Sequence, residues 1–203
     1  MLFGVDLSHW NKNEWGRESN LWDIPQFALF KATEGRNYFD SCTYEYFTSA
    51  KKHDILPGFY HYARPENNTP AEEAKHFYDV ISVITGGNFD GILLALDWEG
   101  NALKEPLTWA REWLDLVYES TGIKPLFYCQ RTFVKNCDII AAGDNGLWIA
   151  DWRADIEHYQ MDYKPWPVWA IRQTGDKPFD TDIFNGDFDQ LKAYATPDGT
   201  EVV

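Results

Sequence analysis

DGILLALDWEG, residues 90–100, joins an unbroken apolar run to two carboxylates. An Asp-Gly turn begins the segment, five apolar residues follow, and a second glycine ends it. A short run that is apolar on both faces is typical of a strand in a parallel sheet covered by helices. The segment therefore predicts a buried strand that carries Asp97 and Glu99 at its carboxyl end.

Asp97 and Glu99 are separated by one residue. Because side chains alternate across a strand, both carboxylates are expected on one face, while Trp98 points away from them toward the core. Catalytic groups collect at the carboxyl ends of parallel strands, and two neighbouring carboxylates cannot both ionise freely. One acid should keep a proton and serve as a general acid beside a charged partner. The alternative, a solvated acidic turn, fits poorly with the apolar run before the pair.

The composition favours an acidic domain that binds planar or sugar-like ligands. Aromatic residues make up 17% of the 203 residues, which is more than a core of this size needs. The 18 lysines and arginines against 32 aspartates and glutamates give a net charge of −14, which repels a phosphate backbone and excludes a nucleic-acid partner. We expect one domain over residues 1–194, followed by a polar tail over residues 195–203, and a monomer.

Nothing in the sequence indicates a disulfide framework, a zinc site or a membrane anchor. The three cysteines, Cys42, Cys129 and Cys137, are odd in number and follow no ligand spacing. The first residues show no signal peptide, and no apolar run is long enough for stable membrane insertion. The chain is expected to be made in a host cytoplasm, or to be secreted with a leader that this sequence lacks. No cofactor is predicted.

Strand and helix patterns alternate in the first part of the chain only. Strands are predicted at residues 2–7, 27–32, 57–65, 125–129, 146–152, 167–175 and 179–188 in addition to the acidic one. Helices are predicted at residues 41–53, 67–82, 107–121 and 187–194. The expected fold class is α/β, a modified TIM-type (β/α) barrel with strand–helix units in its first half and helix-poor last strands.

Other polar residues follow the predicted strands. Asp6 ends the first strand, where it is either a site carboxylate or a cap for the next segment. Lys31 and Glu34 end the second strand, where a buried lysine needs an acid as partner, and they are candidates for the site. His61 lies within the third strand, and a lone histidine there is more often a hydrogen-bonded structural residue than a catalyst.

With these segments in view, the chain resembles glycoside hydrolase family 25, the Chalaropsis-type lysozymes, many of which are bacteriophage endolysins. The resemblance covers nearly the whole chain. It rests on GVDLSHWN, FALFKATEG, GFYHYARP, LALDWE, LFYC, LWIADW and FDTDIFNG.

The resemblance implies hydrolysis of the β-1,4 bond between N-acetylmuramic acid and N-acetylglucosamine in peptidoglycan. In that family role, Glu99 is the general acid and Asp97 is its partner, which stabilises or orients an intermediate built from the substrate's own N-acetyl group. Asp6 and Asp180 match two further site aspartates. Asp182 is a second choice, since the family more often has Asn at that position. The spacing of the acid pair leaves a retaining and an inverting outcome open.

Two departures from the family pattern concern loops. Asn11 is followed by Lys12 where the family signature has Pro, Gly or Glu, and residues 23–25 stand where a Gly is expected. These changes leave the carboxylates untouched and affect the shape of one side of the cleft.

Four side chains at strand ends are predicted to contact sugar or acetamide, namely Tyr62, Tyr128, Trp152 and Gln173. For each of them, packing inside the barrel is the alternative. Two rival functions remain. One is a non-catalytic glycan-binding barrel or phage tail component, which the presence of all four expected acids disfavours. The other is a metal-dependent hydrolase with ligands drawn from Asp6, His9, His61, Asp97 and Asp180; no dense motif supports it, and no metal site is predicted.

Overall fold

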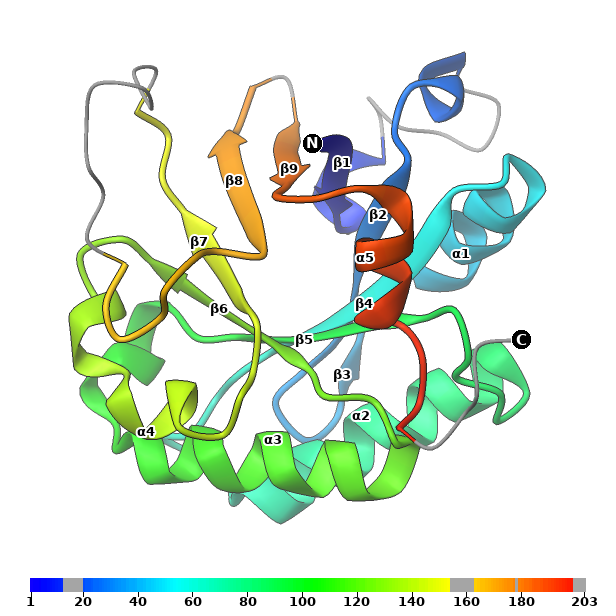
Figure 1. Cartoon of the computed structure of the whole chain (residues 1–203). Helices are drawn as coiled ribbons and strands as arrows, with labels where there is room; N and C mark the ends of the chain where they lie inside the picture. Colours follow the sequence, from blue (N-terminus) through cyan, green and yellow to red (C-terminus); the bar gives the residue numbers. More distant parts are fainter. Residues whose placement is uncertain (13–19, 154–162, 178, 199–203) are drawn as a thin grey trace.

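The computed structural model describes residues 1–12, 20–153, 163–177 and 179–198 and shows a barrel with helices around it (Figure 1). The barrel strands are β1 (Leu2–Leu7), β2 (Phe27–Glu34), β4 (Leu56–Tyr62), β5 (Leu93–Asp97), β6 (Leu126–Gln130), β7 (Leu147–Ala150), β8 (Ile171–Gly175) and β9 (Asp180–Phe184). Pairing of β1 with both β2 and β9 closes the sheet, and the two-residue β3 (Tyr38–Phe39) adds to β2. The predicted α/β barrel is confirmed.

The barrel is mixed because its last strand runs in the opposite direction. All neighbouring pairs from β1 through β2 and β4 to β8 are parallel, whereas β9 is antiparallel to β8 and to β1. The end of the barrel that receives the carboxyl ends of the parallel strands therefore receives the amino end of β9. In that register Asp180 lies opposite Asp6, and Asp182 lies opposite Gly4.

The helices cover the barrel unevenly, as the sequence predicts. They are α1 (Thr43–Lys52), α2 (Pro70–Thr85), α3 (Leu107–Thr121), α4 (Asp138–Ala141) and α5 (Phe188–Ala193). Helix α2 begins with a capping box between Thr69 and Glu72, with Pro70 in its first turn. Helices α2 and α3 both end at a left-handed glycine, Gly86 and Gly122. The helix-poor second half is confirmed, whereas β3 was not predicted.

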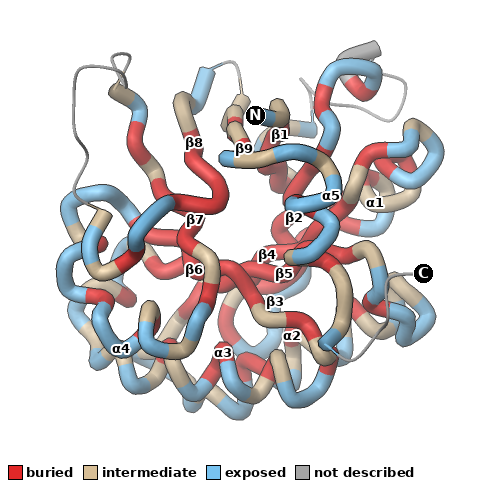
Figure 2. Tube along the Cα trace, in the orientation of Figure 1, coloured by how far each residue is buried: buried red, intermediate tan, exposed pale blue. Residues whose placement is uncertain are grey.

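Alternation along the strands separates two buried layers. Inward-facing residues fill the lower barrel and include Phe27, Leu29, Leu93, Leu126, Trp148, Ile171 and Phe184. Outward-facing residues such as Phe30, Leu94 and Leu96 pack with Phe77 and Trp113 of the surrounding helices. In Figure 2 the buried stretches of the barrel strands, drawn in red, lie at the centre of the molecule. Only the top of the barrel interior, at the carboxyl ends of the parallel strands, is left to polar side chains.

His61 belongs to the outer layer and is structural. It is fully buried, its ring stacks on Trp113 at 5.2 Å between centroids, and its nitrogens lie 2.7 Å from Thr33 Oγ1 and 2.7 Å from Glu73 Oε2. Burial lowers the pKa of His61, and the Glu73 carboxylate opposes that shift. The interpretation of His61 as a hydrogen-bonded structural residue is confirmed, and this contact ties α2 to β4 behind the barrel.

The residues after α5 continue to pack on the barrel. Ala195 is fully buried, and the amide of Asp198 donates a 2.9 Å hydrogen bond to the carbonyl oxygen of Gly122. The rest of the predicted tail, residues 199–203, lies outside the described residues. Among the helices that the structure describes, none combines the length and the hydrophobicity that a bilayer crossing requires.

We predict that Gly4→Ala destabilises the barrel. A Cβ atom on Gly4 would lie 2.3 Å from Cζ of Phe27, which is fully buried and has no room to move. The free energy of unfolding should fall by about 1–3 kcal/mol, as for other overpacked cores. Urea denaturation followed by circular dichroism measures the change.

Gly175→Ala is the matched control, since its Cβ would meet only Thr181 Oγ1 at an ordinary 3.8 Å. Its unfolding free energy should stay within about 0.5 kcal/mol of the parent chain. Equal denaturation midpoints for the two variants would contradict the packing described for the barrel interior.

Candidate active site

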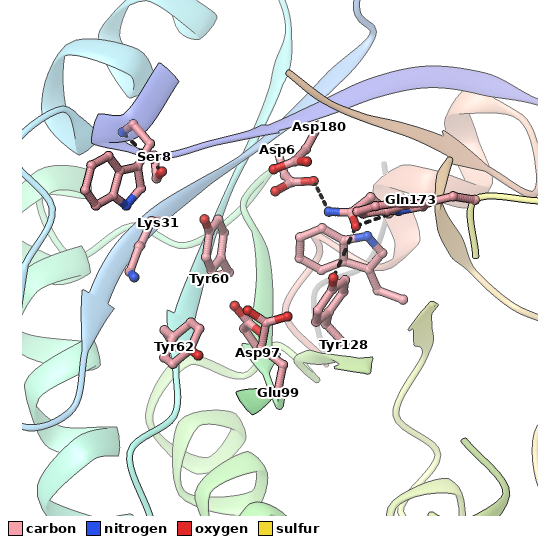
Figure 3. Close-up of a pocket in the computed structure, with 13 residues that line it drawn as sticks. Asp6, Ser8, Lys31, Tyr60, Tyr62, Asp97, Glu99, Tyr128, Gln173 and Asp180 are labelled. Atoms are coloured by element: carbon pink, nitrogen blue, oxygen red, sulfur yellow. Dashed lines mark hydrogen bonds between the residues drawn. The ribbon is translucent and has the colours of Figure 1, made fainter. Parts of the chain in front are cut away.

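A cavity of about 310 Å³ opens at the end of the barrel where the parallel strands finish (Figure 3). Its lining residues are Asp6, Ser8, Trp10, Lys31, Tyr60, Tyr62, Asp97, Glu99, Tyr128, Trp148, Trp152, Gln173 and Asp180. Most of them come from the inward-facing positions of the barrel strands, directly above the apolar interior. The cavity is therefore the polar top layer of the barrel.

Asp97 and Glu99 lie together in this cavity because the chain stays extended beyond β5. Asp97 is the last residue of β5, and Glu99 has φ −144° and ψ −176°, so the alternation of side chains continues. Trp98 points the other way, is fully buried, and packs against Trp109 and Phe127. The predicted placement of all three side chains agrees with the structure.

Gly100 then turns the chain away from the cavity in the left-handed region, at φ +60°. A Cβ atom at this position would lie 2.8 Å from the Tyr62 hydroxyl. Both the backbone angle and the close approach require glycine. The turn thus fixes where the strand ends and holds Glu99 at the mouth of the barrel.

The environment of the acid pair favours the protonated form. Burial raises the pKa of Asp97 well above its ordinary value, and the Glu99 charge adds to this shift. Burial also raises the pKa of Glu99, against the opposing effect of Lys31 and Arg64. Because the two carboxyls share one desolvated cavity, the pair retains a proton to higher pH than carboxyls in water do.

One oxygen of Asp97 has no hydrogen-bond partner among the residues that the structure describes. Asp97 is 7% exposed, and its Oδ1 makes no hydrogen bond to any residue that the structure describes. A buried carboxylate oxygen in this state is costly unless a ligand donates to it. Asp97 is therefore set to accept a hydrogen bond from a group that enters the cavity.

Lys31 brings a positive charge to the acid pair, and Glu34 holds it there. The Lys31 ammonium lies 2.6 Å from Glu34 Oε2, and Arg64 donates to Glu34 Oε1 at 2.6 and 2.8 Å. The ring of Tyr62 has Lys31 Nζ at 4.6 Å and Arg64 Cζ at 4.7 Å from its centroid. The prediction that buried Lys31 needs an acid partner is confirmed.

Gln173 fixes the opposite wall. Its amide nitrogen donates a 2.8 Å hydrogen bond to Asp6 Oδ2, while its oxygen accepts from the Tyr128 hydroxyl and from Trp152 Nε1, each at 3.1 Å. These two donors set the orientation of the amide, since both require the oxygen on their side. The Gln173 side chain on β8 thereby links β1, β6 and the segment after β7.

Asp180 lines the cavity, whereas Asp182 does not. Asp180 pairs with Asp6 across β1 and β9, and burial raises the pKa of Asp180 to about 6. Asp182 lies one step deeper in the same strand and is fully buried. The sequence left open which of the two faces the cavity, because residues two apart share one face of a strand.

The structure brings nine of the ten predicted site residues to the cavity wall. The tenth, Glu34, lines an adjoining groove of about 960 Å³ that also includes Trp10, Lys31 and Tyr62. The prediction missed four lining residues: Ser8, Trp10, Tyr60 and Trp148. Tyr60 was detectable, since it shares a strand face with Tyr62.

The five proposed ligands of the rival metal site do not converge. His61 faces the helices on the outside of the barrel, as described above. His9 Nδ1 lies 2.6 Å from Asp40 Oδ2 and is directed toward that carboxylate. Only Asp6, Asp97 and Asp180 of the proposed set line the cavity.

Comparison with known proteins agrees with this arrangement. The chain is 26% identical over 206 residues to the uncharacterized protein YegX of Escherichia coli K12, covering 95% of this chain and 73% of YegX. It is 26% identical over 214 residues to Lysozyme M1 of Streptomyces globisporus, covering 95% of this chain and 70% of the lysozyme. The solved structure of a muramidase from Trichobolus zukalii is similar at 25% identity with a TM-score of 0.80, covering 96% of this chain and 99% of that one.

Residues 5–178 match the family described as Glycosyl hydrolases family 25. The match spans most of the barrel, from β1 to the segment before β9. It includes the acid pair at the end of β5 and, apart from β9, the strands that surround the cavity. The chain belongs to glycosyl hydrolase family 25.

Proposed function

We propose that this glycoside hydrolase is a muramidase that cleaves the β-1,4 bond between N-acetylmuramic acid and N-acetylglucosamine in peptidoglycan, with Glu99 as the general acid. The relatives named lysozyme and muramidase support this substrate class. The observation that carries the proposal is the pair of desolvated carboxyls, Asp97 and Glu99, in one open cavity. Two such carboxyls flanking a glycosidic bond are the machinery of most glycosidases.

In the first step Glu99 donates its proton to the glycosidic oxygen as the bond from that oxygen to C1 breaks. The carbonyl oxygen of the substrate's N-acetyl group forms a new bond to C1, giving a cyclic oxazolinium ion. Asp97 accepts a hydrogen bond from the acetamide N–H and stabilises the positive charge that develops there. The unpartnered Oδ1 of Asp97 supplies the acceptor.

In the second step water attacks C1 and opens the ring, and the Glu99 carboxylate takes the proton from that water. Glu99 is thereby returned to its protonated form, and the acetamide is released intact. The alternative is direct attack of water activated by Asp97, without help from the acetamide.

The remaining site residues bind the glycan. Trp10 and Trp152 are 79% and 52% exposed and stand at the rim, where indole rings can stack on sugar faces. Tyr62, Tyr128 and Gln173 present hydroxyl and amide groups to the sugar bound beside the acids. The groove that begins at Lys31 and Glu34 gives a polymer room to continue beyond the cavity. We place the action of the chain at the cell wall, as in an endolysin.

A non-catalytic glycan-binding barrel, as in a phage tail component, is the alternative function. It would need neither a proton on Glu99 nor an open acceptor on Asp97. The burial of both carboxyls costs stability, and a binding module gains nothing from that cost.

We predict that Glu99→Gln abolishes hydrolysis. Glutamine keeps the size of the side chain but has no proton to donate at the glycosidic oxygen. Release of reducing ends from purified peptidoglycan should fall by about 10²–10⁴-fold. Mass spectrometry of the products should identify muramic acid at the new reducing ends made by the parent chain.

Glu119→Gln is the control, because Glu119 is an exposed residue of α3 far from the cavity. It should retain the activity of the parent chain. If Glu99→Gln hydrolyses as fast as this control, Glu99 is not the acid. If the folded parent chain binds walls but releases no reducing ends, the binding module replaces the enzyme.

Substrate assistance predicts that the acetamide is required. The rate of cleavage should fall by at least about 100-fold on peptidoglycan whose muramic acid amines are free, since no carbonyl oxygen can then reach C1. Chemical N-acetylation of the same preparation should restore the rate, which controls for other damage to the polymer. Equal rates on both preparations would assign Asp97 the role of base or nucleophile instead.

A further inference from the structure

Two carboxyl groups contact one another at the cavity floor, one lining the cavity and one below it. Asp6 is 5% exposed and Asp182 is fully buried, and the Asp6 side chain on β1 is hydrogen bonded to the side chains of both Asp182 and Asp180 on β9. One oxygen of Asp6 and one of Asp182 are already acceptors. Asp6 Oδ2 accepts from the Gln173 amide at 2.8 Å, and Asp182 Oδ1 accepts from Trp148 Nε1 at 2.8 Å.

The second oxygen of Asp182 lacks a donor. Its Oδ2 is buried and makes no hydrogen bond to an N–H or O–H group of any described residue. Two ionised carboxylates only accept hydrogen bonds, so a contact between them requires a proton on one of them. Tyr128 and Trp152 fix the orientation of the Gln173 amide so that its nitrogen points toward Asp6, and this amide therefore does not donate to Asp182.

We propose that Asp6 and Asp182 share one proton, and that Asp182 is through this bond a positioning residue that holds Asp6 against Gln173. The pair then carries one negative charge instead of two. Its link to Gln173 reaches Tyr128 and Trp152, which form the cavity wall. The catalytic consequence rests on the proposed function, whereas the shared proton does not.

The surroundings of the pair favour retention of the proton. The titratable and charged groups that face this end of the barrel are Asp180 on β9, Asp97 and Glu99 on and after β5, Lys31 on β2, Tyr60 on β4 and Tyr128 on β6. Carboxylates outnumber the single lysine, so a second charge on the pair would be repelled. In agreement, burial raises the pKa of Asp182 to about 7 and raises that of Asp6 well above its ordinary value.

The test is the pH dependence of thermal stability. Since the folded-state pKa is raised, the folded chain holds the proton more tightly than the unfolded chain does. The stability that this proton contributes is present below about pH 4 and is lost as pH rises toward 7. In Asp182→Asn a permanent amide donor replaces the proton, and this loss disappears.

We therefore compare the Tm of Asp182→Asn with that of the parent chain at each pH. The difference, variant minus parent, should be about 5 °C larger at pH 8 than at pH 4. Asp189→Asn, which changes an exposed carboxylate of α5, is the control and should show a constant difference. A constant difference for Asp182→Asn as well would overturn the shared proton, since a purely structural defect lowers stability equally at each pH.

Activity at pH 5 tests the positioning role. Asparagine can donate to Asp6 and accept from Trp148, so Asp182→Asn should keep muramidase activity within about threefold of the parent chain. Asp182→Ala loses both bonds and should fall by at least about tenfold. An asparagine variant as inactive as the alanine variant would overturn the role. A parent chain with no muramidase activity would refute the proposed function, while the thermal measurement still decides on the proton.

Discussion

Carboxyl groups at one end of the barrel are buried away from water, and the neighbouring side chains are arranged to compensate for this burial. Closure of the sheet brings Asp6, Asp97, Asp180 and Asp182 into its upper interior, with Glu99 at the mouth. Charges in such a place are expensive, and a fold can tolerate them only through protons, hydrogen-bond donors or counter-charges. This barrel uses all three, and each also serves the reaction that we propose.

The antiparallel last strand decides how the acids are divided. A parallel β9 would present its carboxyl end to the cavity; reversed, it presents Asp180 at the rim and places Asp182 below it. Gly4 lies opposite Asp182 and has no side chain, so the barrel has room there for the Phe27 ring. Strand β9 thus supplies two carboxyls beside β1: Asp180 lines the cavity, and Asp182 supports Asp6 from below. On the other side of β1, Lys31 of β2 supplies the counter-charge and is itself held by Glu34.

Local sequence patterns predicted the acid pair. They did not predict contacts that form only when the barrel closes. The apolar run before Asp97 and the alternation of side chains were sufficient to place Asp97, Trp98 and Glu99, because each depends on neighbours in the same strand. The contact between Asp6 and Asp182 was not predictable, since the two residues lie near opposite ends of the chain and meet only through the register of β1 with β9. The sequence pattern of a strand does not show how deep a residue lies in the barrel. Periodicity therefore could not show which of Asp180 and Asp182 lines the cavity.

Desolvation keeps a proton on Glu99, and a ¹³C NMR titration of the Glu99 carboxyl carbon measures this proton. The resonance is assigned by its disappearance in Glu99→Gln. We predict a titration midpoint above the ordinary glutamate value of 4.5, because burial raises the pKa of Glu99. A midpoint at or below 4.5 in the parent chain would refute the role of Glu99, because Glu99 would then be ionised under conditions in which it must donate a proton.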